Sequence, residues 1–153
     1  MIKSRVHATA GFVGLTLITL FFTSSVVVEL IGDEHAVTRV KTLILFGVLI
    51  LVPAMMVTGA TGRIIAGHRN SPLIRAKKKR MIGVAAIGLT VLVPCAVILQ
   101  RLAVAGDFGT AFYAIQIVEL IGGAVNITLL GRNVRAGRLL AGRSPVRAAA
   151  RSR

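Results

Sequence analysis

Residues 8–31 read ATAGFVGLTLITLFFTSSVVVELI, a continuous apolar run in which Glu29 is the only charged residue. Three more apolar runs follow, at about residues 42–62, 81–105 and 110–131. A helix of about 20 apolar residues crosses the hydrocarbon layer of a bilayer, which is roughly 30 Å thick. The sequence therefore predicts an all-α fold, an integral membrane bundle of four helices.

Charged residues are sorted around these four runs. When the runs are threaded through a membrane, all 19 Lys and Arg residues except Arg39, Lys41 and Arg101 fall in segments that share one side. The acidic residues fall in the opposite connections or in the helix halves beside them: Glu29, Asp33, Glu34, Asp107 and Glu119. Cytoplasmic segments of membrane proteins are rich in Lys and Arg, so the pattern predicts that both termini are cytoplasmic, N-in and C-in.

The net charge of +14 raises the question of a nucleic-acid partner. The basic residues flank the apolar runs, where anionic lipid attracts them, and no stacking aromatic side chains accompany the basic run at residues 77–80. The sequence therefore predicts the lipid bilayer as partner and no nucleic acid. The N-terminal run is too long for a signal peptide and has no A-x-A site, so we expect it to remain as the first helix.

The chain divides into a four-helix transmembrane domain, residues 1–143, and a basic tail, residues 144–153. The tail consists mainly of Arg, Ala and Ser, a composition that predicts a disordered cytoplasmic segment. Pro53 and Pro94 both fall near the middle of their apolar runs, where the missing backbone N–H is expected to bend the helix. The single cysteine, Cys95, is expected to be a small packed side chain.

One face of the first helix suggests a cofactor site. At 100° per residue, His7, Gly11 and Gly14 lie along one line of the helix. An imidazole followed by glycines one and two turns later lets a flat porphyrin lie against the backbone while the ring ligates its iron. Small residues at this spacing are also the usual means of close packing between membrane helices, and both interpretations stand at this stage.

A haem at His7 would need further groups on the same side of the membrane. His68, at the cytoplasmic end of the second helix, is the expected second axial ligand, and Met81 is the alternative. Arg63 and Arg80, together with the rest of the basic run at residues 77–80, are expected to neutralise the propionates.

One face of the fourth helix is polar, since Gln116, Glu119 and Asn126 share a stripe with small residues. A carboxylate deep in a membrane helix is costly unless it is protonated, paired or hydrated, so Glu119 is a functional candidate. Its expected partners are Gln116, Asn126, and Gln100 and Arg101 of the third helix. Glu29 is shallower, and we expect it to pair with Arg39 or Lys41.

No motif of soluble enzyme chemistry is present in the sequence: there is no Cys and His pattern with zinc spacing, no phosphate-binding loop and no nucleophile elbow. The sequence therefore leaves open whether the protein is an enzyme.

The layout resembles the small bacterial four-helix membrane cytochromes of b type, an N-in and C-in bundle with His7 at the head of the first helix and Gly11 and Gly14 beneath it. The resemblance implies haem b bound through His7 near the cytoplasmic face, electron transfer with a quinone or other redox partner, and the inner membrane of a bacterium. The several in-membrane histidines of di-haem relatives are absent, so only one haem per chain is implied.

A second resemblance is to small multidrug exporters, in which a membrane carboxylate exchanges protons for a cation across a dimer. It implies a small proton-coupled transporter that uses Glu119. Those proteins carry the carboxylate in the first helix and line the cavity with Trp and Tyr, whereas this chain has no Trp and one Tyr. A third alternative is an accessory subunit of a larger membrane complex. Small-residue stripes also predict a homodimer, with Gly47, Gly122 and Gly123 as contact points.

Overall fold

A computed structural model describes residues 2–67 and 71–142, and every regular element within these residues is helical. His68 and the predicted tail at residues 144–153 lie outside the described residues. The elements are α1 (Ile2–Ile31), α2 (Glu34–Ala66), α3 (Pro72–Ile87), the π-helical turn η1 (Gly88–Leu92), α4 (Val93–Val104) and α5 (Thr110–Gly142). The predicted all-α fold is confirmed for this part of the chain.

Four helical stretches are long and apolar enough to cross a membrane: α1, α2, the run Pro72–Val104 that contains α3, η1 and α4, and α5. These four stretches correspond to the four apolar runs of the sequence. The chain is therefore a candidate multi-pass membrane protein by the length and composition of its helices.

The helices extend beyond the predicted limits, because polar residues at their ends continue or cap them. Asp33 accepts a hydrogen bond from the Ala36 N–H and so begins α2 eight residues before the apolar run at residue 42. Ser71 caps α3 in the same way, with Pro72 in its first turn. At about 1.5 Å per residue, helices of this length exceed the hydrocarbon layer, so their ends reach the headgroup layers.

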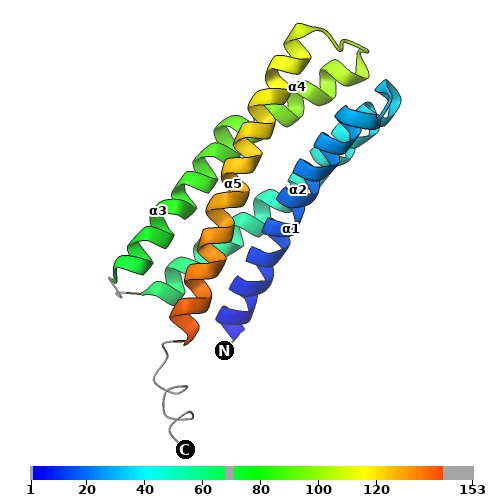
Figure 1. Cartoon of the computed structure of the whole chain (residues 1–153). Helices are drawn as coiled ribbons and strands as arrows, with labels where there is room; N and C mark the ends of the chain where they lie inside the picture. The colour runs from blue at the N-terminus through cyan, green and yellow to red at the C-terminus, as the bar shows by residue number, and fades with distance from the viewer. Residues whose placement is uncertain (1, 68–70, 143–153) are drawn as a thin grey trace, which may run out of the picture.

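The helices alternate in direction around the bundle (Figure 1). α1 packs against α2 and α5, α5 also packs against α3 and α4, and α2 packs mainly against α1 and then against α4. The first residue of α1 and the last residue of α5 lie at one end, called the basic end below because the sequence predicts its excess of Lys and Arg. The turns at residues 32–33 and 105–109 lie at the other end, called the acidic end.

Two apolar clusters hold the bundle together. The larger one lies toward the acidic end and contains Val28, Val37, Cys95, Leu99, Ala103 and Phe112. The smaller one joins Ile18 of α1, Val84 of α3 and Leu130 of α5. Large apolar side chains such as Phe12, Leu43 and Ile121 remain exposed on the outside, as expected for surfaces that face lipid. Cys95 is buried in packing, as the sequence predicts.

Pro94 explains the break in the third spanning stretch. Proline has no backbone N–H and its ring crowds the carbonyl four residues earlier. Just upstream, the helix widens into the π turn η1, in which the Val93 N–H donates to the Gly88 carbonyl. Pro53 lies within α2, which remains α-helical from Glu34 to Ala66.

The glycines that the sequence offered as dimer contacts pack inside the bundle instead. A Cβ atom on Gly122 would lie 2.9 Å from the Leu92 side chain, and one on Gly123 would lie 3.3 Å from Phe22. Gly47 is covered by the ring of Phe21 across the α1–α2 interface. Because these glycines already contact side chains of the same chain, they offer no support for the predicted homodimer.

Substitution of Gly47 tests this packing. Gly47→Ala would put a methyl group into the Phe21 ring, and we expect it to lower the free energy of unfolding by about 1–3 kcal/mol, the usual cost of overpacking. Gly59→Ala in the same helix is the matched control, because nothing lies within 4 Å of its Cβ position. Thermal unfolding in detergent, followed by circular dichroism, measures both. Equal stability of the two variants would contradict the packing.

Candidate functional site

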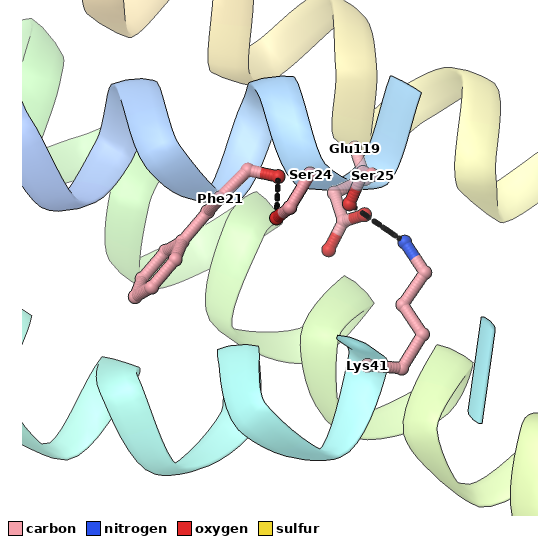
Figure 2. A network of polar contacts seen from close by, with 5 residues as sticks. All are labelled: Phe21, Ser24, Ser25, Lys41 and Glu119. Atoms are coloured by element: carbon pink, nitrogen blue, oxygen red, sulfur yellow. Dashed lines mark hydrogen bonds and ion pairs between the residues drawn. The ribbon is translucent and has the colours of Figure 1, made fainter. Parts of the chain in front are cut away.

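A buried ion pair joins three helices in the half of the bundle nearest the acidic end. The Lys41 Nζ on α2 donates to the Glu119 Oε2 on α5 at 2.7 Å and to the Ser25 Oγ on α1 at 3.1 Å (Figure 2). The Lys41 side chain is 0% exposed and that of Glu119 is 12% exposed. The neighbouring Ser24 bonds to the Phe21 carbonyl of its own helix and takes no part.

The local helix geometry brings these three side chains to one level. Ser25, Lys41 and Glu119 lie six, seven and nine residues from the acidic ends of α1, α2 and α5. These separations correspond to about 9 to 14 Å from the helix ends at the α-helical rise. The Lys41 side chain is fully buried inside the bundle, where an isolated charge is very costly, so each charge depends on the other.

Two more polar side chains complete what we call the polar cluster, defined as Ser25, Glu29, Lys41, Gln116 and Glu119. Glu29 lies one turn beyond Ser25 on α1 and interacts electrostatically with both charges of the pair. Its Oε1 atom is buried without a hydrogen-bond partner among the described residues. Gln116, one turn before Glu119, is 3% exposed, and neither of its amide atoms has a partner in that part of the chain. The cluster thus holds one ammonium and two carboxylates.

The pairing differs from the one expected from the sequence. Glu119 pairs with Lys41, not with Gln116, Asn126, Gln100 or Arg101. Within the described residues Glu29 makes no ion pair with Arg39 or Lys41. The sequence interpretation placed Lys41 outside the second helix, because the apolar run starts at residue 42. The capping residue Asp33 was the signal that could have put Lys41 two turns inside α2.

The polar face of α5 is longer than the sequence predicted. Asn126 is buried and its Nδ2 donates to the Val84 carbonyl at 3.4 Å, just before the π turn. Asn133 is buried about two helical turns further along α5, with its Nδ2 3.8 Å from the Met81 sulfur. Asn133 was missed because the predicted helix ended at residue 131. From Gln116 to Asn133 this face covers about 25 Å along the helix axis.

His7 is held by α2. Its Nδ1 atom lies 3.0 Å from the Thr58 carbonyl and 3.2 Å from the Thr61 Oγ1. Its ring lies against Gly62, so that a Cβ atom there would approach the ring Cε1 to 3.0 Å. The histidine therefore bridges α1 and α2 near the basic end.

The glycine face below His7 also contacts α2. A Cβ atom on Gly11 would lie 3.5 Å from Thr58, and one on Gly14 would lie 2.7 Å from the Met55 sulfur. The space that a porphyrin would need against this face is filled by α2 side chains, so the residues do not fit a haem in this arrangement. Close helix packing, the other interpretation of the pattern, is what these contacts support.

Of the other residues predicted for the haem, Lys77 of the basic run lies near enough to His7 to interact with it electrostatically. Arg63 is exposed, Arg80 is half-buried, and Met81 contacts Asn133 of α5. His68 lies outside the described residues, so the pairing of His7 and His68 as axial ligands stays a prediction. Residues 2–67 and 71–142 hold no group of three or more His, Cys, Asp or Glu side chains that could bind a metal ion.

Comparisons with known proteins assign no function to the polar residues described above. No protein-family model, no curated protein and no solved structure matches the chain.

The ion pair can be tested through stability. Glu119→Gln leaves the Lys41 ammonium buried without its countercharge, and we expect a loss of about 3–5 kcal/mol in the free energy of unfolding. The double variant Lys41→Met, Glu119→Met removes both charges, and we expect it to be more stable than the single variant. Glu34→Gln, at an exposed carboxylate in the first turn of α2, is the control and should have no measurable effect.

Chemical unfolding in detergent, followed by circular dichroism, gives these values. A double variant as unstable as Glu119→Gln, or a single variant as stable as Glu34→Gln, would contradict a mutually dependent pair.

Proposed function

We propose that this protein is a small membrane transporter that couples to protons, with the polar cluster as its proton-carrying centre. The observation that carries the proposal is the membrane-depth Lys41–Glu119 pair with a second carboxylate, Glu29, beside it. Ionisable residues inside membrane helices are costly, and they commonly belong to ion and proton pathways.

The charge balance of the cluster argues for a mobile proton. The Lys41 ammonium can neutralise one carboxylate, and Glu119 lies 2.7 Å from it. Glu29 has no such partner among the described residues, and one of its oxygens is buried. In a medium of low dielectric constant, a proton or an external cation must balance the second carboxylate. Binding and release of that cation would change the attraction that Lys41 exerts on Glu119.

The polar face of α5 continues from the polar cluster toward the basic end. Beyond Glu119 it carries Asn126 and Asn133, both buried and each with an amide oxygen that has no partner among the described residues. Buried amides of this kind are normally hydrogen-bonded, often to water. The face therefore offers hydrogen-bonding groups over most of the membrane thickness.

Proton flux tests the proposal directly. Proteoliposomes containing a pH-sensitive dye are given a pH gradient, with the membrane potential clamped by potassium and valinomycin. We expect the wild-type protein to dissipate the gradient faster than protein-free vesicles do. Glu29→Gln should reduce the rate to that of empty vesicles, because the amide cannot bind the mobile proton. Glu119→Gln should do the same, because Lys41 is then left to balance Glu29, which no longer needs a proton.

Glu34→Gln is the matched control, since its carboxylate is exposed and remote from the cluster, and it should retain the wild-type rate. The folded double variant Lys41→Met, Glu119→Met should be inactive. If wild-type protein were no faster than empty vesicles, the pair would serve only the stability of the bundle, as expected for an accessory subunit.

We further propose that the protein lies in the cytoplasmic membrane of a bacterium with the basic end inside, because Lys and Arg favour the cytoplasmic side. Single-cysteine variants in a Cys95→Ala background test the orientation. His35→Cys, near the acidic-end turn, should react with an impermeant maleimide on intact cells. Ser4→Cys, at the basic end, should react only after permeabilisation. The reverse labelling pattern would contradict this orientation.

The haem hypothesis stays a prediction, together with its quinone or other redox partner. The Nδ1 contact of His7 with the Thr58 carbonyl is the kind of bond that orients metal-ligating histidines, but α1 and α2 would have to separate to admit a porphyrin. An absorption spectrum of the purified protein and of the His7→Ala variant distinguishes the two functions.

A further inference from the structure

A half-buried lysine occupies the interface between α3 and α5 near the basic end. The Lys77 Nζ lies 3.4 Å from the position that a Cβ atom on Gly137 of α5 would take. Its neighbours Lys78 and Lys79 on the same helix are exposed. The missing side chain of Gly137 thus creates a notch that holds the Lys77 side chain against the neighbouring helix.

No acidic side chain of this protein can neutralise Lys77. The sequence contains five Asp and Glu residues, and all of them are described and lie in the half of the bundle nearest the acidic end: Glu29, Asp33, Glu34, Asp107 and Glu119. The surroundings of Lys77 add positive charge instead, because Arg80 and Arg138 lie within one turn of Lys77 and Gly137 along their helices. A cationic site without an acidic partner favours the binding of an external anion.

The floor of the notch carries an unsatisfied polar group. Asn133 lies one turn from Gly137 on the same face of α5 and is 5% exposed. Its Nδ2 has only the weak contact with the Met81 sulfur, and its Oδ1 has no partner among the described residues. Met81 is in turn one helical turn from Lys77, so the pairs Lys77–Gly137 and Met81–Asn133 form successive layers of one interface. An amide that can be oriented either way can donate a hydrogen bond to an anionic oxygen.

We propose that this notch, formed by Lys77, Asn133 and Gly137, binds the phosphate of an anionic phospholipid headgroup. The helix ends reach beyond the hydrocarbon layer, so the notch lies at the depth of the headgroups. Basic pockets between membrane helices are known binding sites for such headgroups. Lys77 supplies a charge-assisted hydrogen bond, and Asn133 supplies a neutral donor beneath it.

Native mass spectrometry of the detergent-solubilised protein, titrated with phosphatidylglycerol or phosphatidylcholine, tests the site. We expect wild-type protein to retain phosphatidylglycerol in preference to phosphatidylcholine. Lys77→Gln should weaken phosphatidylglycerol binding about tenfold, the effect of losing one charge-assisted hydrogen bond. Gly137→Leu leaves the charge unchanged but fills the notch, and it should weaken binding to a similar extent.

Lys78→Gln is the matched control, because it makes the same change of charge one residue away on an exposed side chain. It should bind within about twofold of wild type, a difference of less than about 0.5 kcal/mol. Circular dichroism melting shows that each variant is folded. An equal loss in Lys77→Gln and Lys78→Gln would overturn the site in favour of general attraction by a basic surface. Competition by inorganic phosphate at equal concentration would overturn the lipid as the ligand, since a free anion would then suffice.

Discussion

The contact between the Lys41 ammonium and the Glu119 carboxylate constrains the rest of the bundle. The Lys41 side chain is fully buried and the Glu119 side chain is nearly so, and a shift of either helix would therefore leave a buried charge without its partner. Ser25 extends the same constraint to α1. Three helices are thereby fixed in register by one set of polar contacts, while the apolar clusters on either side supply nondirectional packing.

The bundle buries several polar side chains and exposes many large apolar ones. Large apolar side chains cover the outside, whereas Gln116, Asn126 and Asn133 are buried on one face of α5. This reversal is stable only in an apolar solvent, where outward-facing hydrocarbon costs nothing and buried amides stabilise helix contacts. The polar cluster, with its extra carboxylate, is the part of this interior that packing alone does not explain. It therefore motivates the proton-coupled function.

Charge is segregated along the bundle as well as across it. The acidic residues gather toward one end, so the lysine and arginine side chains that the structure describes at the other end form no ion pair with them. At the acidic end the protein satisfies its own buried charge through Lys41. At the basic end we propose that anions from outside balance the charge. The notch at Gly137 is where a lysine side chain lies within a helix interface.

The sequence by itself determined the four long apolar helices, the placement of both described ends at one end of the bundle, and the polar face of Gln116, Glu119 and Asn126. Hydrophobic run length and charge asymmetry are local properties, so they can be read from the chain. Only the tertiary structure decided that Glu119 pairs with Lys41 and that Gly11 and Gly14 pack against α2. Both facts depend on the rotation and register of neighbouring helices. These are set jointly by residues that lie far apart in the sequence. A periodic pattern on one helix shows which face carries polar or small residues, but it does not show which residues of the neighbouring helix contact that face.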